Sequence, residues 1–234
     1  MATTVKKYPL GTYVIGCILT AVFPPALFLA LAGNWLWLEG WIFSLWFDAM
    51  VLFNSIYLYT RDPALLAERT KMPGSDNQKG WDRYVLVGAL IAFAAWLVIM
   101  PLDAERFRWS PAFPVWLKIL GGLLLIPAIY LIERTTMENT YLSTMVRIQS
   151  ERKQRVISTG VYGFVRHPLY LGCLMMMIGG PLLVGSLYGL VIAFVASLAL
   201  TGRITGEEKM LTEELEGYTE YRQKVKYRLI PLIW

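Results

Sequence analysis

Long apolar stretches separated by short polar segments run along most of this sequence. A membrane-spanning helix needs about 20 apolar residues, and about six stretches reach or approach that length. The pattern predicts an all-α integral membrane protein with about six transmembrane helices. The predicted stretches are Gly11–Leu31, Leu38–Tyr59, Tyr84–Pro101, Val115–Ile132, Leu169–Val184 and Leu187–Leu200.

The last two stretches are short, and little more than Gly185 and Ser186 separates them. The first of the pair also contains several glycines and a proline. We interpret the pair as a tight helical hairpin, so five spans plus this hairpin stay open as an alternative to six. In either case the ends of the hairpin, near Pro168 and Arg203, should be neighbours.

The polar tail after the last apolar stretch also shows a helical pattern. From Glu207 to Val225, one set of residues recurs at three-and-four spacing, which predicts a helix with one continuous face. Gly217 lies inside this segment and weakens the helical pattern. The chain then ends in RLIPLIW, whose Trp234 suits a membrane interface.

The composition agrees with a membrane protein. Apolar residues make up 56% of the chain, there are nine tryptophans, and the mean hydropathy is +0.47. Cys17 and Cys173 lie far apart in apolar stretches, so neither a disulfide framework nor a metal cluster is predicted. The first apolar stretch resembles a signal peptide, but it contains two prolines and lacks a clear cleavage site, so we interpret it as a membrane helix.

The distribution of charge predicts the orientation. With six crossings, the N-terminus, the two long loops and the tail share one side, which holds nearly all basic residues, including Lys6 and Lys7. The opposite side holds only Arg106, Arg108 and Lys118. The positive-inside rule therefore places both termini in the cytoplasm. Topology and anionic lipid headgroups explain the net charge of +5, and no nucleic-acid partner is predicted.

Two groups of polar residues lie at the cytoplasmic ends of the hairpin. Arg166 and His167 precede Pro168, a residue suited to the first turn of a helix. Alone, this corner is typical of an interfacial anchor. Glu207 and Glu208 are equally typical of a solvated helix end, and Glu207 is spaced for an ion pair with Arg203. Together, the groups predict a mouth for an amphiphilic ligand.

The order of the motifs points to a family. The run GVYGFVRHPLYLG is followed by RITGEEKML and then by EGYTEYRQKVKYRLIPLIW. From Asn139 to Trp234 the sequence resembles the isoprenylcysteine carboxyl methyltransferase family. The resemblance divides the chain into N-terminal transmembrane helices, residues 1–132, and a methyltransferase core, residues 133–234, made of the cytoplasmic loop, the hairpin and the tail.

The resemblance implies a membrane methyltransferase that uses S-adenosylmethionine without a Rossmann domain, with a C-terminal cytoplasmic helix closing the cofactor pocket. No metal is expected. On this basis Tyr221 would wall the reaction centre, and Arg222 or Lys224 would bind the acceptor carboxylate, with Arg228 as a competitor. The predicted cofactor-binding residues, three of which (Arg166, Arg203 and Glu207) would hold the site together, are Gln149, Tyr162, Arg166, His167, Tyr170, Arg203, Glu207 and Glu208.

The family resemblance leaves the methyl acceptor open. A prenylated cysteine carboxylate or a similar lipophilic acid is the leading prediction, and a phospholipid amine or a thiol is the alternative. An amine acceptor would need a base, for which His167 is the strongest candidate. Membrane lipids would surround the helices as partners.

Two functions outside methyl transfer are compatible with parts of the sequence. A sterol-reductase-like enzyme shares similar C-terminal motifs, but the short chain argues against it. Asp48, inside the second apolar stretch, would suit a transporter, because intramembrane carboxylates often mark ion paths. We interpret Asp48 as lying near the interface or bonded beside Asn54. The loop at residues 61–81 either covers a substrate portal or only connects helices.

Overall fold

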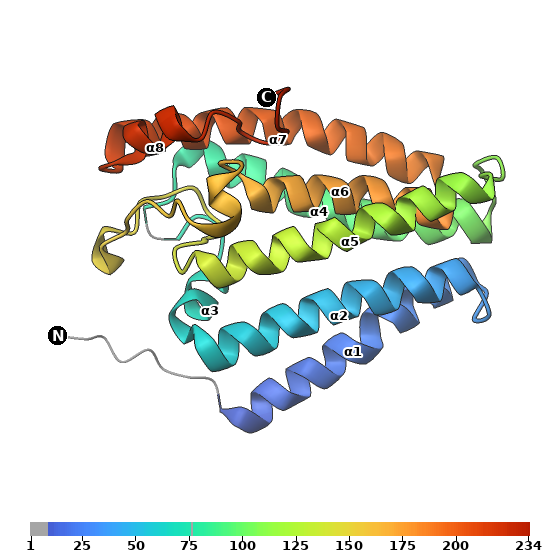
Figure 1. Cartoon of the computed structure of the whole chain (residues 1–234). Helices are drawn as coiled ribbons and strands as arrows, with labels where there is room; N and C mark the ends of the chain where they lie inside the picture. Colours follow the sequence, from blue (N-terminus) through green and yellow to red (C-terminus); the bar gives the residue numbers. More distant parts are fainter. Residues whose placement is uncertain (1–8, 76) are drawn as a thin grey trace.

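The computed structural model describes residues 9–75 and 77–234, and these residues form helices joined by loops (Figure 1). Lys6 and Lys7, part of the predicted positive cluster, lie outside the described residues. Shorter turns of π and 3-10 helix occupy Leu102–Arg106, Ser150–Arg152 and Gly160–Gly163. The α-helices are α1 (Leu10–Ala32), α2 (Leu38–Arg61), α3 (Pro63–Arg69), α4 (Gly80–Pro101), α5 (Val115–Glu138), α6 (Pro168–Val184), α7 (Leu187–Glu214) and α8 (Tyr218–Lys224).

The predicted apolar stretches all fall within helices. Five of the described helices are long and apolar enough to cross a bilayer, while α6, with 17 residues, is shorter. The helices run side by side, and large apolar side chains such as Phe23, Ile91 and Phe194 are exposed on the bundle surface, as expected for contact with lipid. The expectation that both hairpin helices are short was wrong for α7, which has 28 residues.

Helix α6 packs closely along α5 because glycines line their interface. A Cβ atom added to Gly172 would lie 2.9 Å from Ile132 Cγ1 and 3.0 Å from the Ala128 carbonyl oxygen. Small residues let membrane helices approach in this way. At the start of α6, Pro168 occupies the first turn, as predicted. The position of the Arg166–His167 corner is therefore fixed by α5.

The far end of the hairpin is held by a buried carboxylate. Asp103 accepts hydrogen bonds from the hydroxyls of Ser110 at 2.7 Å and Ser186 at 2.6 Å, and from the Tyr188 amide at 3.2 Å. Ser186 also caps α7 by accepting from the Gly189 amide at 2.9 Å. The connection between α4 and α5 is thereby joined to the turn between α6 and α7.

The tail differs from the single helix that its pattern predicted. Helix α7 continues without a break to Glu214, and Gly217, with φ of 82°, separates it from α8. The positive φ explains the break, because a residue without a Cβ adopts it at little cost. The predicted boundary at residues 132 and 133 lies inside α5, which packs on α6, so the two segments share one bundle.

Asp48 lies inside the helix bundle. The residue is buried, and its Oδ1 has no hydrogen-bond partner among the described residues. The amide of Asn54 instead donates to Glu133 Oε2 at 3.1 Å and to Thr136 Oγ1 at 3.0 Å, both on α5. The predicted bonding of Asp48 beside Asn54 was therefore wrong, while its position relative to the membrane interface stays a prediction.

Polar groups gather at one end of the bundle. In Figure 1, α3, α8 and the loop between α5 and α6 all lie at the end where α1 begins, and short connections lie at the other end. This grouping agrees with the predicted clustering of the basic loops on one side.

Candidate functional site

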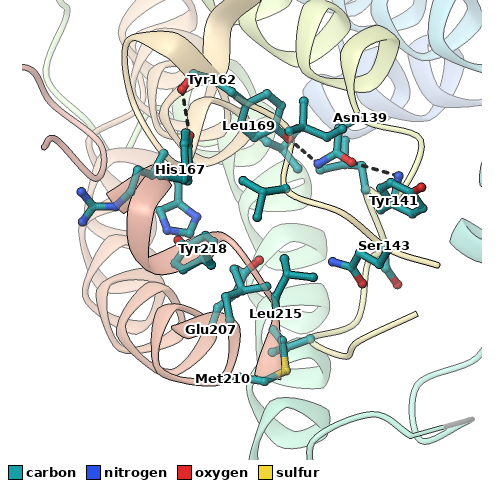
Figure 2. A pocket seen from close by; sticks show the side chains of 18 of the residues that line it. Asn139, Tyr141, Ser143, Tyr162, His167, Leu169, Glu207, Met210, Leu215 and Tyr218 are labelled. Carbon is teal, nitrogen blue, oxygen red and sulfur yellow. Dashed lines mark hydrogen bonds between the residues drawn. The ribbon is translucent and has the colours of Figure 1, made fainter. Parts of the chain in front are cut away.

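A pocket opens at the polar end, between the loop that follows α5, the start of α6, the second half of α7 and α8. Figure 2 shows Glu207 and Tyr218 on one side of it and Asn139, Tyr141 and Ser143 on the other. Its lining combines charged, aromatic and aliphatic side chains. The predicted amphiphilic mouth therefore corresponds to a cavity built from segments far apart in sequence.

Backbone hydrogen bonds connect the Arg166–His167 corner to the tail that follows α8. The Arg166 amide donates to the Tyr227 carbonyl at 3.0 Å, and the His167 amide donates to the Arg228 carbonyl at 2.9 Å. The Arg166 guanidinium adds bonds to the carbonyls of Val225 at 2.7 Å and Lys226 at 2.8 Å. The segment after α8 is thus fixed over the entrance to α6.

Glu208 is the centre of a buried charge network. Only 2% of the residue is exposed, and its Oε1 receives Arg166 Nε at 2.5 Å and lies 3.3 Å from His167 Nε2. Its Oε2 receives Arg228 Nε at 2.7 Å. Both oxygens are therefore occupied by protein groups, and Glu208 is absent from the pocket lining.

Glu207, the preceding residue, faces the pocket. Glu207 is half-buried, lines the pocket and accepts a hydrogen bond from Tyr170 Oη at 2.8 Å. His167 stacks on Tyr170, with ring centroids 5.5 Å apart. The adjacent acidic pair thus divides into one carboxylate facing the cavity and one neutralised behind it.

An aromatic wall formed by Tyr162, Tyr218 and Tyr221 closes the cavity. Tyr221 Oη donates to the Tyr162 carbonyl at 2.8 Å, and Asn139 Nδ2 donates to Tyr162 Oη at 2.8 Å. Tyr218 Oη is buried and has no hydrogen-bond partner among the residues described. Burial raises the pKa of all three phenols, so they stay neutral at physiological pH.

The segment between α2 and α4 supports the pocket from outside. Glu68 on α3 pairs with Arg147 at 2.8 Å and accepts from Ser143 Oγ at 2.9 Å, and both of these residues line the pocket. Burial alone would raise the pKa of Glu68, but hydrogen bonds from Arg147, Lys71 and Ser143 outweigh it and hold the pKa at about 2. The loop at residues 61–81 therefore braces the pocket wall.

Besides Glu208, four predicted site residues lie outside the pocket lining. Gln149 is fully buried, and its side chain donates to the Tyr141 carbonyl at 2.7 Å. The ion-pair partner of Arg203 is Asp82 on α4, at 2.9 Å, and not Glu207 as its spacing suggested. Arg222 and Lys224 are exposed on α8, because the buried face of this short helix carries Tyr218 and Tyr221.

Several residues that the structure brings to the site carry only weak signals in the sequence. Asn139 and Tyr218 lie within the motif segments, but neither had a distinctive spacing. Glu68, Asp82 and Arg147 lie in loops or at helix ends, where charged residues are common, and only the fold brings them together.

Comparisons with known proteins agree with this arrangement. The profile of the isoprenylcysteine carboxyl methyltransferase family matches residues 123–213. A protein-S-isoprenylcysteine O-methyltransferase from Saccharomyces cerevisiae is 38% identical over 128 residues, 53% of this chain and 52% of the relative. Residues 123–213 are therefore similar to the isoprenylcysteine carboxyl methyltransferase family. The matched region contains the Arg166–His167 corner and both glutamates.

Two further relatives extend the comparison. Protein-S-isoprenylcysteine O-methyltransferase B from Arabidopsis thaliana is 27% identical over 139 residues, 58% of this chain and 67% of the relative. The match spans only about half the length of the yeast relative. A solved structure of a eukaryotic intramembrane Ras methyltransferase of this family superposes with a TM-score of 0.53 and 18% identity, covering 97% of this chain and 88% of the other. The helical membrane fold is thus shared.

Proposed function

We propose that this chain is a membrane methyltransferase that transfers a methyl group from S-adenosylmethionine to the carboxylate of a prenylated cysteine or a similar lipophilic acid. The observation that carries the proposal is the pocket of charged and aromatic groups at one end of an apolar bundle, in a chain whose residues 123–213 match the isoprenylcysteine carboxyl methyltransferase family. By the positive-inside rule the pocket faces the cytoplasm, as do both termini.

The polar groups that line the pocket fit S-adenosylmethionine. Glu207 presents a carboxylate to the cavity for the ammonium group, and Tyr218 offers a buried hydroxyl that has no partner among the described residues. Arg155, exposed at the pocket lining, would receive the cofactor carboxylate. Tyr162, His167 and Tyr170 complete the proposed contacts. Because its oxygens are occupied, we assign Glu208 to positioning Arg166 and His167, with Gln149 and Arg203 supporting the surrounding loops.

In the proposed reaction the protein mainly has to align the reacting groups and to exclude water. Bound S-adenosylmethionine would supply the methyl group: a carbon–oxygen bond forms as the sulfur–carbon bond breaks, the electron pair stays on sulfur, and no proton is transferred. An ionised acid therefore needs no general base. The neutral tyrosine wall and the strapped tail would exclude water that otherwise solvates the acceptor carboxylate, and their fixed positions would set its line of attack.

The contacts of His167 favour an acid over an amine acceptor. An amine would have to lose a proton during the reaction. His167 lies 3.3 Å from Glu208 Oε1 and stacks on Tyr170, so its ring is held within the protein network. An ionised carboxylate acceptor loses no proton, so it does not require His167 to act as a base.

Two measurements on detergent-purified protein test the proposal. Calorimetry should show saturable binding of S-adenosylmethionine and S-adenosylhomocysteine, with weaker binding in His167→Ala. Tritiated methyl transfer should be seen to N-acetyl-S-farnesylcysteine but not to its primary amide. A folded protein that binds neither cofactor form would refute the methyltransferase. Cofactor binding with transfer only to a lipophilic amine or thiol would refute the acid acceptor.

A further inference from the structure

Hydrogen bonds hold Tyr162 in the pocket wall by its backbone and by its side chain. The amide of Val161, the residue before it, donates to Glu138 Oε2 at 2.9 Å. The Tyr162 carbonyl accepts from Tyr221 Oη at 2.8 Å, and Tyr162 Oη accepts from Asn139 Nδ2 at 2.8 Å. Glu138 ends α5 and Asn139 follows it, so the end of one helix fixes both the backbone beside Tyr162 and its hydroxyl oxygen.

The orientation of the Asn139 side-chain amide follows from its two contacts (Figure 2). The backbone amide of Tyr141 can only donate, and it lies 2.9 Å from Asn139 Oδ1. The carbonyl oxygen of the side chain must therefore face Tyr141, which leaves the NH₂ group facing Tyr162. An amide nitrogen donates hydrogen bonds and does not accept them. Asn139 consequently binds the oxygen of the Tyr162 hydroxyl and cannot take its proton.

The hydroxyl proton of Tyr162 has no acceptor among the described residues. Within that part of the chain, the bond from Asn139 is the one that this hydroxyl forms. Burial raises the pKa of the phenol, so the group is neutral and keeps its proton. Tyr162 is 7% exposed and lines the pocket, and buried donors are normally satisfied. A ligand in the pocket completes this hydrogen bonding only if it offers an acceptor.

The position of Tyr162 favours the adenine base of the proposed cofactor as that ligand group. Figure 2 shows Tyr162 and Glu207 at opposite ends of the pocket, and Glu207 is proposed to hold the ammonium group. An elongated S-adenosylmethionine bound in this way would bring its adenosine half to Tyr162. Val156 and Ile157 line the pocket and pack against the cluster that contains Tyr162. Such apolar side chains suit a flat base better than ribose hydroxyls, which need polar partners.

We propose that Asn139 is a positioning residue, which directs the Tyr162 hydroxyl to donate a hydrogen bond to a ring nitrogen of the cofactor's adenine. This role rests on the methyltransferase function proposed above and specifies what one end of its pocket recognises. Asn139 acts through Tyr162: by binding the hydroxyl oxygen, it leaves the proton for the ligand. The pocket therefore selects an acceptor at this point and disfavours a donor or a C–H group.

Calorimetry with S-adenosylhomocysteine and three of its deaza analogues tests the recognised atom. Each analogue carries a C–H group in place of one ring nitrogen, N1, N3 or N7. In the unsubstituted protein, one analogue should bind about tenfold more weakly than S-adenosylhomocysteine, because it leaves the phenol proton unbonded. Tyr162→Phe should bind S-adenosylhomocysteine about tenfold more weakly and should show no further loss with that analogue.

Asn139→Asp tests the positioning role. The carboxylate keeps the shape of the amide and can still accept from the Tyr141 amide, but its second oxygen would take the Tyr162 proton. This variant should therefore lose the analogue penalty as Tyr162→Phe does, although its tyrosine is intact. Gln154→Glu is the matched control. It adds the same charge to the pocket lining and can still accept from the Gln149 amide, so it should keep the penalty.

Three results would overturn the proposal. The first is equal affinity of the unsubstituted protein for S-adenosylhomocysteine and all three analogues. The second is a penalty that persists in Tyr162→Phe, which would assign the donor to another residue. The third is a penalty that persists in Asn139→Asp, which would show that Asn139 does not orient the hydroxyl. Each protein is compared with itself across ligands, so a general loss of stability does not alter the ratio. A folded, unsubstituted protein that binds no S-adenosylhomocysteine would instead refute the methyltransferase function itself.

Discussion

Arg166 and Glu208 form a buried ion pair at 2.5 Å, although 42 positions separate them in the sequence. The pair joins the corner before α6 to the second half of α7, and Arg228 adds the tail to the same carboxylate. Three segments of the site are therefore held by one side chain.

Glu208→Gln should disrupt the whole site. The amide keeps the shape of the carboxylate but removes the charge that balances Arg166 and Arg228, and breaking a buried ion pair costs about 3 kcal/mol or more. We expect a lower thermal midpoint together with loss of S-adenosylmethionine binding, measured by scanning fluorimetry and calorimetry. Glu213→Gln, an exposed substitution on the same helix, is the control. Normal stability in Glu208→Gln would contradict the central role of this network.

Tyr218→Phe and Tyr221→Phe should have different effects. The Tyr218 hydroxyl has no partner among the described residues, so its removal should leave stability unchanged or raise it by up to about 1 kcal/mol, while cofactor affinity falls about tenfold. The Tyr221 hydroxyl bonds to the Tyr162 carbonyl at 2.8 Å, so its removal should cost about 1 kcal/mol of stability. Thermal midpoints and calorimetric affinities measure both. Equal losses of stability in the two variants would argue against a ligand for Tyr218.

Acid should destabilise the protein through Glu68. Its pKa is about 2 when folded, below the ordinary value of 4.5, so the stabilisation is present above about pH 5 and is lost as the pH falls toward 2. Thermal midpoints measured in detergent across this range should fall for the unsubstituted protein. Glu68→Gln should start lower and show a shallower dependence. Parallel curves for the two proteins would show that Glu68 does not titrate in this window.

Gly172→Ala should loosen the contact between α5 and α6. The added methyl group would meet Ile132 and the Ala128 carbonyl oxygen within about 3 Å, and such overpacking costs about 1 to 3 kcal/mol. Gly88→Ala on α4, where no atom lies within 4 Å of the added group, is the matched control. Thermal midpoints of the two variants decide the point, and a stable Gly172→Ala protein would show that the helices can separate without cost.

The apolar pattern was sufficient to predict the membrane helices and the meeting of the hairpin ends. It succeeded because membrane helices must be apolar along their length, and Pro168 and Ser186 mark where α6 and α7 begin. The long reach of α7 was missed because its second half, beyond Leu200, is polar. A helix that leaves the bilayer and continues into water no longer carries the apolar signal.

The individual roles within the site were harder to predict. Glu207 and Glu208 are adjacent and chemically identical, so only their positions around α7 separate the pocket carboxylate from the buried one. The partner of Arg203 was expected four residues away, but Asp82 on another helix takes that position. Sequence spacing describes neighbours along one helix, whereas these contacts depend on packing between helices.

The anchoring of α6 and α7 at both ends affects how ligands enter the site and how the product leaves it. Asp103 holds Ser186 at the far turn, and Tyr170 holds Glu207 at the pocket. The positions of the two helices are therefore fixed at both ends. We expect ligands to enter and leave through movement of the loop after α5 and of the tail after α8. The exit of a methylated, uncharged product would then require no movement of the bundle, only the release of bonds at its polar end.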